Sequence, residues 1–393
     1  MPDLSTIPQA TRNLLLSRPV ELNDDAPWTP LRKPLSECTL GLVTSAGVHL
    51  RDDAPFVRND SSYRVMPHTV QHRDILQSHS SLGFDRTAIM QDVNVVFPVD
   101  RLRELVADGS LGGLGPRFYS FMGAQEDVSP IKDTTSWEVG RRLADDDVDI
   151  VLLTPSCPVC TSTISVIARN FELSGLPTVI LSLVREHVVK IRPPRALYVP
   201  FPFGLPVGHV DDSTQQRAVL EAALNLFTAE SGPVLEDFAA ADGVVEPGSP
   251  LQASGVEHRV NELDLATEVS LMRHYWEDWV AVKGRSAVGL SGYDPKQFRA
   301  IVRFLEGYVA GSTKGIPGGR DEHLSVFVRH CVDDLKSLYF EGRMATHPTE
   351  SSRARAHWFW SETTLGGFLP SLAQRMREAT DPLTRETARG IVR

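Results

Sequence analysis

The stretch that decides the fold is "DIVLLTPSCPVCTSTISVIARNFELSGLPTVILSL", residues 149–183. An apolar run ends at Pro155, Ser156 and Pro158 indicate a helix start, and Gly175 is typical of a helix end. A second apolar run then begins at Pro177. The stretch therefore predicts a strand, a helix and a second strand, which is the repeating unit of a parallel sheet.

The same alternation extends over the first part of the chain. Strands are expected at residues 39–45, 117–123, 148–154, 177–183 and 196–201, and helices at 99–109, 136–146, 161–175 and 214–231. This order is typical of an α/β fold. We predict a mainly parallel sheet with helices on both faces.

Helical patterns dominate after a loop-like span at residues 240–257. Helices are expected at residues 262–282, 294–311, 321–342 and 354–379. We therefore predict two domains: an α/β domain over residues 1–245 that carries a C-x-x-C motif, and an all-α domain over residues 257–393. The second domain holds four of the six tryptophans, which would suit helix packing, a lid, or the contact surface of a homodimer.

The composition limits the class of protein. With 41% hydrophobic and 23% charged residues, the chain has the make-up of a globular protein. A formal net charge of -10 argues against general nucleic-acid binding, which needs a basic surface. The chain has no run of about 18 apolar residues and its start resembles no targeting peptide, so we expect a cytoplasmic protein without a membrane span.

The C-x-x-C motif consists of Cys157 and Cys160, and three interpretations of it remain open. It is a redox or nucleophilic pair, half of a metal site, or two small core residues. The metal site would add two histidines from the set His49, His79, His187 and His209. If Cys157 stands exposed at a helix start, its pKa should lie below about 8.5, with Cys160 shielded one turn further in.

The other cysteines and one polar loop also allow structural or functional interpretations. Cys38 and Cys331 stand alone and are expected to be buried. The loop "SHSSLGFDR" contains His79, Asp85 and Arg86. A histidine near a thiolate could protonate a leaving group, and an Arg–Asp unit could bind a substrate carboxylate or fix the loop.

Two further histidines are candidate binding residues. His49 follows the first predicted strand, so it lies either at the rim of a cleft or in an exposed loop. His209 ends the loop "PFPFGLPVGH", which the expected strand order brings near Cys157.

Longer motifs resemble a known family. They include "LLTPSCPVCTSTISVIARNFELSGLPTVIL", "PPRALYVPFPFGLPVG", "TPLRKPLSECTLGLVTSAGVHLR", "SHSSLGFDR", "QDVNVVFPVDRLRELVADGSLG" and "YSFMGAQ". In this order they resemble the selenoprotein B family of glycine, sarcosine, betaine and D-proline reductases, particularly its D-proline reductase-like branch. The resemblance covers roughly residues 28–210.

The resemblance implies a chemistry for the cysteine pair. Cys157 stands where the family has its catalytic selenocysteine or cysteine, and Cys160 is its companion. The implied reaction is reductive cleavage of a carbon–heteroatom bond, C–N above all, in a small carbonyl- or carboxylate-containing substrate. A dithiol or thioredoxin-like donor would restore the pair, and no cofactor is firmly implied. A partner reductase subunit is expected, and the alternatives are a metalloenzyme or a dithiol subunit that only passes electrons on.

Overall fold

The computed structural model describes residues 13, 20–81, 83–239, 263–312, 314 and 322–392. Of these, residues up to 71 and from 77 to 239 form one compact unit, and residues 72–76 together with those from 263 onward form another. The predicted linker at 240–257 lies outside the described residues. The domain boundaries at 245 and 257 therefore stay predictions.

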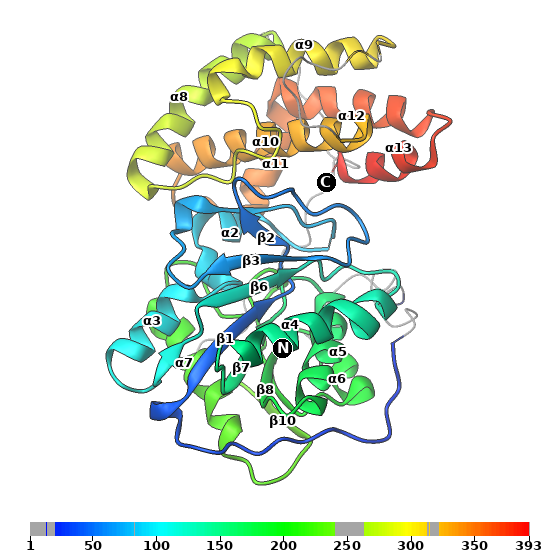
Figure 1. Ribbon diagram of the computed structural model, residues 1–393. Coiled ribbons are helices and arrows are strands. Elements are labelled where there is room, and N and C mark those ends of the chain that lie inside the picture. Colours follow the sequence, from blue (N-terminus) through cyan, green and yellow to red (C-terminus); the bar gives the residue numbers. More distant parts are fainter. Residues whose placement is uncertain are drawn as a thin grey trace. The chain divides into compact units, whose positions relative to one another are not determined.

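The first unit is built on one large sheet (Figure 1). Its strands are β1 (Thr39–Thr44), β3 (Tyr63–Pro67), β5 (Gly113–Leu114), β6 (Arg117–Phe121), β7 (Ile150–Thr154), β8 (Thr178–Ser182), β9 (Arg195–Tyr198) and β10 (Val234–Asp237). They follow the order β10-β9-β8-β7-β1-β6-β3, with β5 also paired to β1. Only β3 runs antiparallel, against β6, so the prediction of a mainly parallel sheet is confirmed.

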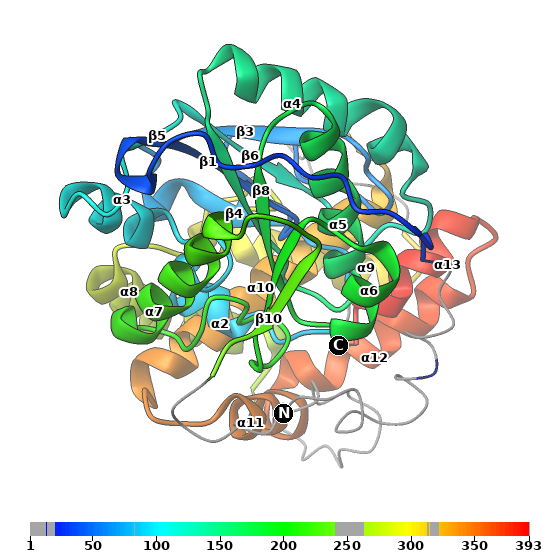
Figure 2. The ribbon, with the colours of Figure 1, turned by 90° about the horizontal axis from the view of Figure 1, so that it is seen from below.

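Helices cover both faces of this sheet (Figure 2). They are α2 (Thr87–Gln91), α3 (Val99–Ala107), α4 (Ser136–Asp145), α5 (Cys160–Leu173), α6 (Arg185–Ile191) and α7 (Ser213–Asn225). Helices α4, α5 and α6 pack side by side on one face, and α3 and α7 pack together on the other. Shorter elements of the first unit are β2 (Val48–Leu50), η2 (Leu35–Glu37), η4 (Val93–Val95), η5 (Ile131–Thr135) and η6 (Leu226–Thr228). Strand β4 (Ile75–Gln77) contains the boundary between the two units.

Apolar strands explain why this sheet sits in the core. Every residue of β7 and β8 is buried, as expected for parallel strands that are covered on both faces. The core on the side of α4, α5 and α6 includes Val151, Leu153 and Ile180 from the sheet. Burial of these apolar strands is the main favourable free-energy contribution to the sheet, and it therefore fixes the positions of the strand ends.

The second unit is built mainly from helices, so the expectation of a helical C-terminal region is confirmed. They are η3 (His72–Asp74), α8 (Leu265–Lys283), η7 (Pro295–Gln297), α9 (Phe298–Val309), α10 (Leu324–Thr346), α11 (Ser352–Glu362), α12 (Thr364–Arg377), α13 (Pro382–Thr387) and η8 (Ala388–Gly390). The long helix α10 packs mainly against α8. Its apolar face forms the centre of a core that includes Leu335, Leu338 and Phe359.

One predicted helix is two helices. The pattern over residues 354–379 breaks at Thr363, whose extended backbone ends α11 and whose hydroxyl accepts the amide of Gly366 at the start of α12. A Cβ on Gly366 would overlap the carbonyl oxygen of Phe359. Only glycine allows the two helices to meet so closely.

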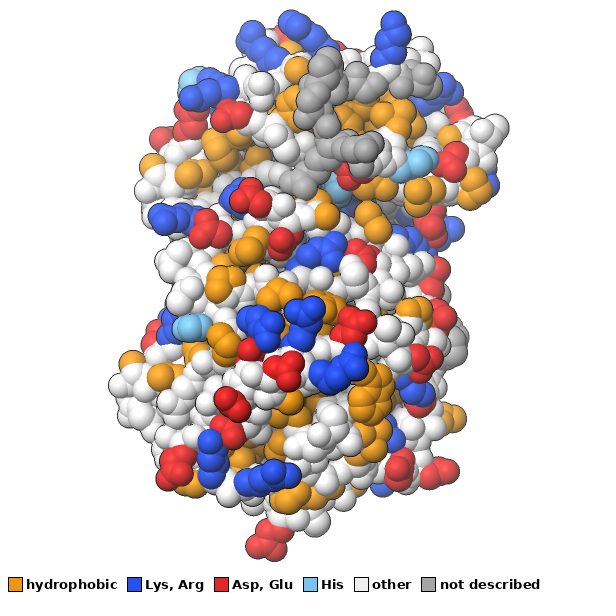
Figure 3. Space-filling model, viewed as in Figure 1, with side chains coloured by type: hydrophobic (Ala, Val, Ile, Leu, Met, Phe, Trp, Pro, Cys, Tyr) orange, Lys and Arg blue, Asp and Glu red, His pale blue; other side chains and the backbone are white. Residues whose placement is uncertain are grey.

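The next features are the charges on the surface and the length and polarity of the helices. Acidic and basic side chains are interspersed on the face shown in Figure 3. Among the described residues, no helix combines the length and the apolar character needed to cross a membrane.

Candidate functional site

The cysteine pair lies where the strand order of the sheet reverses. β1 pairs with β7 on one side and with β6 on the other, so the sheet grows outward from β1 in both directions. Ser45, Gly123 and Cys157 follow the ends of β1, β6 and β7. In open α/β sheets, ligands bind outside the carboxyl ends of the strands at such a switch point. The fold therefore places the C-x-x-C motif at its expected ligand site.

The two sulfurs are in direct contact. Cys157 Sγ and Cys160 Sγ are 2.6 Å apart, and the backbone amide of Cys160 donates to Cys157 Sγ at 3.2 Å. A turn closed by the amide of Cys160 and the carbonyl of Cys157, 3.1 Å apart, brings both side chains together. Because a disulfide holds its sulfurs about 2.0 Å apart, this pair could be oxidised with little movement.

His79 contacts the second sulfur. Its Nε2 lies 3.3 Å from Cys160 Sγ, and its Nδ1 accepts the backbone amide of Ser81 at 3.0 Å. Since Nδ1 is an acceptor, Nε2 carries the ring proton and donates it to the sulfur. The ring also packs edge-on against Phe84, with centroids 5.2 Å apart. The structure thus brings His79 to the cysteine pair and fixes its orientation.

The two sulfurs differ in acidity. Burial raises the pKa of Cys157 well above its ordinary value, and the hydrogen bond with Cys160 raises it further. Burial also acts to raise the pKa of Cys160, but its hydrogen bond with Cys157 and the imidazole of His79 outweigh it. The pKa of Cys160 therefore lies well below its ordinary value. Of the two sulfurs, Cys160 is therefore the one that more readily carries a negative charge.

This result corrects the prediction that Cys157 is an exposed thiol with a lowered pKa. Helix α5 begins at Cys160, and residues 157–159 form a turn before it. The dipole at the helix start therefore acts at Cys160. Both sulfurs are 0% exposed, whereas the sequence pattern had suggested that only Cys160 is shielded.

Apolar side chains enclose the pair. The buried cluster around it contains Phe84, Cys157, Val159, Cys160 and Val184, with the partly buried Ala124 and Phe203 packed against it. The loop that contains Phe203 lies against the cysteine turn, because the amide of Gly204 donates to the carbonyl of Ser156 at 2.7 Å. Such a dry environment strengthens each electrostatic interaction with the thiolate.

The predicted Arg–Asp unit supports the loop that carries His79. Asp85 accepts the amide and the hydroxyl of Thr87 at 2.8 and 3.0 Å, at the start of α2. Arg86 donates to the carbonyl of His79 and, at 3.5 Å, to that of Ser81. These contacts favour the loop-fixing alternative over direct binding of a substrate carboxylate.

The other candidate histidines have their described contacts elsewhere. His49 lies in β2 and is 0% exposed, with Nδ1 2.7 Å from the carbonyl oxygen of Leu50. Of the two alternatives for His49, the exposed loop is therefore wrong, and the position at the rim of a cleft stays a prediction. His209 packs against the ring of Phe201, and His187 lines a separate cavity.

Two residues of the site were missed from the sequence. A Cβ on Gly123 would lie 2.6 Å from Cys160 Sγ, so only glycine fits there. The carbonyl oxygen of Ser45 lies 3.5 Å from the same sulfur, and the buried Ser45 hydroxyl has no hydrogen-bond partner in the part of the chain that the structure describes. Both residues follow predicted strands, so the strand-end rule could have found them.

His79, Cys157 and Cys160 together offer three ligand atoms to a metal ion. The donor atoms of His79, Cys157 and Cys160 all lie within 4.8 Å of one another. Two thiolates bound to one tetrahedral zinc at about 2.3 Å would stand roughly 3.7 Å apart. The observed 2.6 Å is shorter, so the geometry suits a dithiol better than a metal centre.

Comparisons with known proteins agree with the sequence resemblance. A model of the glycine/sarcosine/betaine reductase selenoprotein B family matches residues 18–156. This match ends at the residue before Cys157, so it includes the loop of His79 and leaves out the cysteine pair. No solved structure matches this chain.

Individual relatives cover different shares of the chain. It is 34% identical over 198 residues to the D-proline reductase subunit gamma of Acetoanaerobium sticklandii, which is 50% of this chain and 81% of that protein. It is 30% identical over 152 residues to the glycine reductase complex component B subunit gamma of Peptoclostridium acidaminophilum, 38% of this chain and 34% of that protein. A sarcosine reductase complex component B subunit beta from the same organism is 31% identical over 127 residues, with 32% and 29% covered.

The chain thus spans about a third of the length of the last two relatives and four fifths of the first. The match to the D-proline reductase subunit, joined to the family match over residues 18–156, shows that this chain belongs to the glycine/sarcosine/betaine reductase selenoprotein B family.

Proposed function

We propose that this chain is a cysteine-dependent reductase subunit that cleaves a carbon–heteroatom bond, C–N above all, in a small carbonyl- or carboxylate-containing substrate. The observation that carries this proposal is the Cys157–Cys160 contact of 2.6 Å, with His79 against the sulfur of Cys160. The position of the pair at the switch point supports it. So do the relatives, which are named as subunits of reductases.

In the first step, Cys157 Sγ attacks the carbon next to the carbonyl. The S–C bond forms, the C–N bond breaks, and the nitrogen leaves with the bonding electrons. The proton of Cys157 passes through Cys160 to the departing nitrogen, so Cys160 acts as the base that activates its neighbour. A thiol with a raised pKa is the stronger nucleophile once it is deprotonated.

In the second step, the Cys160 thiolate attacks Cys157 Sγ. The S–S bond forms and the S–C bond breaks, and the carbon leaves as an enolate that takes a proton from water. The substrate has then gained two electrons and the pair has become a disulfide. An external dithiol, small or thioredoxin-like, reduces this disulfide by exchange. The Nε2–H of His79 stabilises the Cys160 thiolate between the two steps.

The proposal includes partners and a location. Several relatives are named as components of multi-subunit complexes, and we propose that this chain also works beside a partner subunit. The scheme needs both thiols in the reduced state, which favours the cytoplasm as its compartment.

Trapping the adduct tests the scheme. Parent protein, Cys157→Ser and Cys160→Ser are incubated with D-proline, glycine, sarcosine or betaine and a dithiol, and intact mass and released amine are measured. Cys160→Ser should accumulate a covalent adduct on Cys157, because the resolving sulfur is gone. Cys157→Ser should show neither adduct nor turnover. Cys331→Ser, which removes an equally buried thiol, is the matched control and should behave like the parent.

Two outcomes contradict this scheme. Turnover that survives in Cys157→Ser would remove that sulfur from the reaction. Thiol–disulfide cycling without any adduct in Cys160→Ser, while a partner subunit is being reduced, would indicate a dithiol that only passes electrons on.

The three clustered donor atoms support one second candidate, a metal site formed by His79, Cys157 and Cys160. Metal content and thermal stability of protein purified without added metal distinguish the two. A stoichiometric metal that disappears in both cysteine variants, together with a lower melting temperature, would favour the metalloenzyme, because loss of a ligand is coupled to folding.

A further inference from the structure

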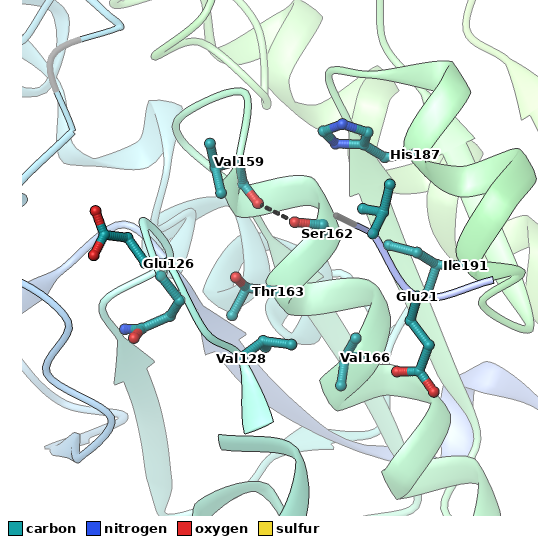
Figure 4. A pocket seen from close by; sticks show the side chains of 11 residues that line it. Glu21, Glu126, Val128, Val159, Ser162, Thr163, Val166, His187 and Ile191 are labelled. Atoms are coloured by element: carbon teal, nitrogen blue, oxygen red, sulfur yellow. Dashed lines mark hydrogen bonds between the residues drawn. The ribbon is translucent and has the colours of Figure 1, made fainter. Parts of the chain in front are cut away.

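Both sulfurs are sealed from solvent, so a substrate needs a route to them. A cavity of about 230 Å³ lies beside the start of α5 (Figure 4). One of its lining residues is Val159, which stands between the two cysteines in the turn. Val159 also belongs to the apolar cluster that encloses Cys157 and Cys160. A single side chain thus borders both the cavity and the dithiol.

We propose that this cavity is the vestibule through which substrate reaches the cysteine pair, and that the side chain of Val159 is the gate between them. This inference rests on the proposed reductase function. It gives that site an entrance, a gate residue and a class of substrate.

The backbone of Val159 is held, so its side chain is the part that can move. Its carbonyl oxygen accepts the hydroxyl of Ser162 at 2.7 Å and the amides of Ser162 and Thr163 at 3.0 and 3.4 Å. These bonds tie the turn to the first residues of α5. A change of side-chain rotamer at Val159 leaves all of them intact, whereas a displacement of the turn would break them.

The walls of the cavity indicate which molecules it accepts. Aliphatic side chains make up much of the lining: Val20, Val128, Val159, Val166 and Ile191. The carboxylates that line it, Glu21 and Glu126, lie on opposite sides (Figure 4). Their basic partners, Lys132 and Arg58, are not among the lining residues.

The aliphatic lining disfavours a charged ligand, because such a ligand would lose its hydration against an apolar wall. A cavity of about 230 Å³ suits a compact molecule. We therefore infer a compact, largely aliphatic substrate that has a carbonyl group and no net negative charge.

Two small alkylating agents test this entrance without any need for turnover. Iodoacetamide and iodoacetate share a leaving group next to a carbonyl and differ in charge. Labelling rates at Cys157 and Cys160 are measured by peptide mass and divided by the rates for the same peptide in the unfolded chain. Cys38 and Cys331, both 0% exposed, report global opening.

Val184→Ala is the matched control for Val159→Ala. Val184 belongs to the same cluster around the sulfurs but does not line the cavity. Val159→Ala should speed labelling of the pair by iodoacetamide about tenfold, because the gate is removed. Val184→Ala should change it little, and labelling of Cys331 should stay slow in both. Iodoacetamide should also be favoured over iodoacetate more strongly than in the unfolded chain.

If Val159→Ala destabilises the fold, a variant that narrows the cavity provides a second test. Val128→Phe fills the cavity away from the cysteine turn and should slow labelling of the pair severalfold. Equal acceleration by Val159→Ala and Val184→Ala, or unchanged labelling in Val128→Phe, would overturn the vestibule. The reductase proposal would survive that result, since adduct trapping on Cys157 is measured separately.

Discussion

Two of the places where the chain buries ionisable side chains completely treat them in opposite ways. At the start of α5, Cys160 is 0% exposed, yet its pKa is lowered. On α10, Cys331, Asp334 and Glu341 are also 0% exposed, and burial raises the pKa of each. Burial alone therefore favours the uncharged form. A charged sulfur needs a second thiol and an imidazole beside it.

The two carboxylates on α10 show what buried acids do when their partners are structural. Asp334 accepts the amides of residues 289–291 and the hydroxyl of Ser291. Glu341 accepts the amide of Ala287, the hydroxyl of Ser286 and the indole N–H of Trp276. Both side chains hold the loop after α8 against α10. Their donors belong to the fold and leave no reactive group, unlike the sulfurs at α5.

The largest expected effect is on thiol reactivity. At pH 7 the α5 pair should react with iodoacetamide at least about a hundredfold faster than Cys331, because the pKa of Cys160 is lowered and that of Cys331 is raised. Between pH 6 and pH 8 the rate of the pair should rise less steeply than that of Cys331. The rate of Cys331 should rise about tenfold for each pH unit. Quenched labelling followed by peptide mass measures both in one sample.

The slope of the labelling rate against pH is the decisive part of that experiment, because this slope does not depend on how often each site opens. Cys38, whose pKa is also raised by burial, is the internal control and should follow Cys331. A rate at the pair that climbs as steeply as that of Cys331 would mean that the site keeps both protons, and would remove the contrast between the two regions.

The second effect concerns stability on the α10 side. Burial raises the pKa of Glu341 to about 7 from its ordinary 4.5. A raised pKa in the folded state gives stability that is present below pH 4.5 and is lost as pH rises through 7. The free energy of unfolding should therefore fall by up to about 3 kcal/mol between pH 5 and pH 8 through this group. Glu341→Gln should remove this dependence.

Urea unfolding at pH 5, 6, 7 and 8 measures that change. The exposed Glu306 on α9 provides the control, and Glu306→Gln should keep the parent's pH dependence. If Glu341→Gln and Glu306→Gln follow the same curve, burial on α10 does not govern the titration of Glu341.

Local patterns predicted much of the first region and less of its chemistry. Apolar runs and helix-end residues are local signals, so the sheet, α5 and the place of the C-x-x-C motif followed from the sequence. The position of Cys157 relative to the helix start did not, because Ser156 and Pro158 suit a helix start and a turn equally well. The helix therefore begins three residues later than the first cysteine, and this shift moves the favoured thiolate from Cys157 to Cys160.

Contacts between residues that lie far apart in the sequence were harder to predict. His79 lies 81 positions from Cys160, and its candidacy came from the family-like motif around it. Ser45 and Gly123 reach the same sulfur from two other strands. Their contact depends on the strand order around β1, which periodicity does not give. On α10, the sequence alone would place the buried acids on a solvent-exposed helix face. Their burial depends on hydrogen-bond donors from the loop at 286–291.

The smallest expected effect tests the imidazole that distinguishes the two regions. His79→Ala removes the ring beside Cys160, so the pKa of the pair should rise toward that of an ordinary buried thiol. Labelling of the pair by iodoacetamide should fall about tenfold at pH 6 and stay unchanged at pH 9, where the thiolate forms without help. His79→Gln keeps a hydrogen-bond donor and should recover part of the loss. His209→Gln, at a ring that packs against Phe201, should change nothing. An equal loss at every pH in His79→Ala would mean that His79 acts through access to the site, and the low pKa of Cys160 would then depend on Cys157 alone.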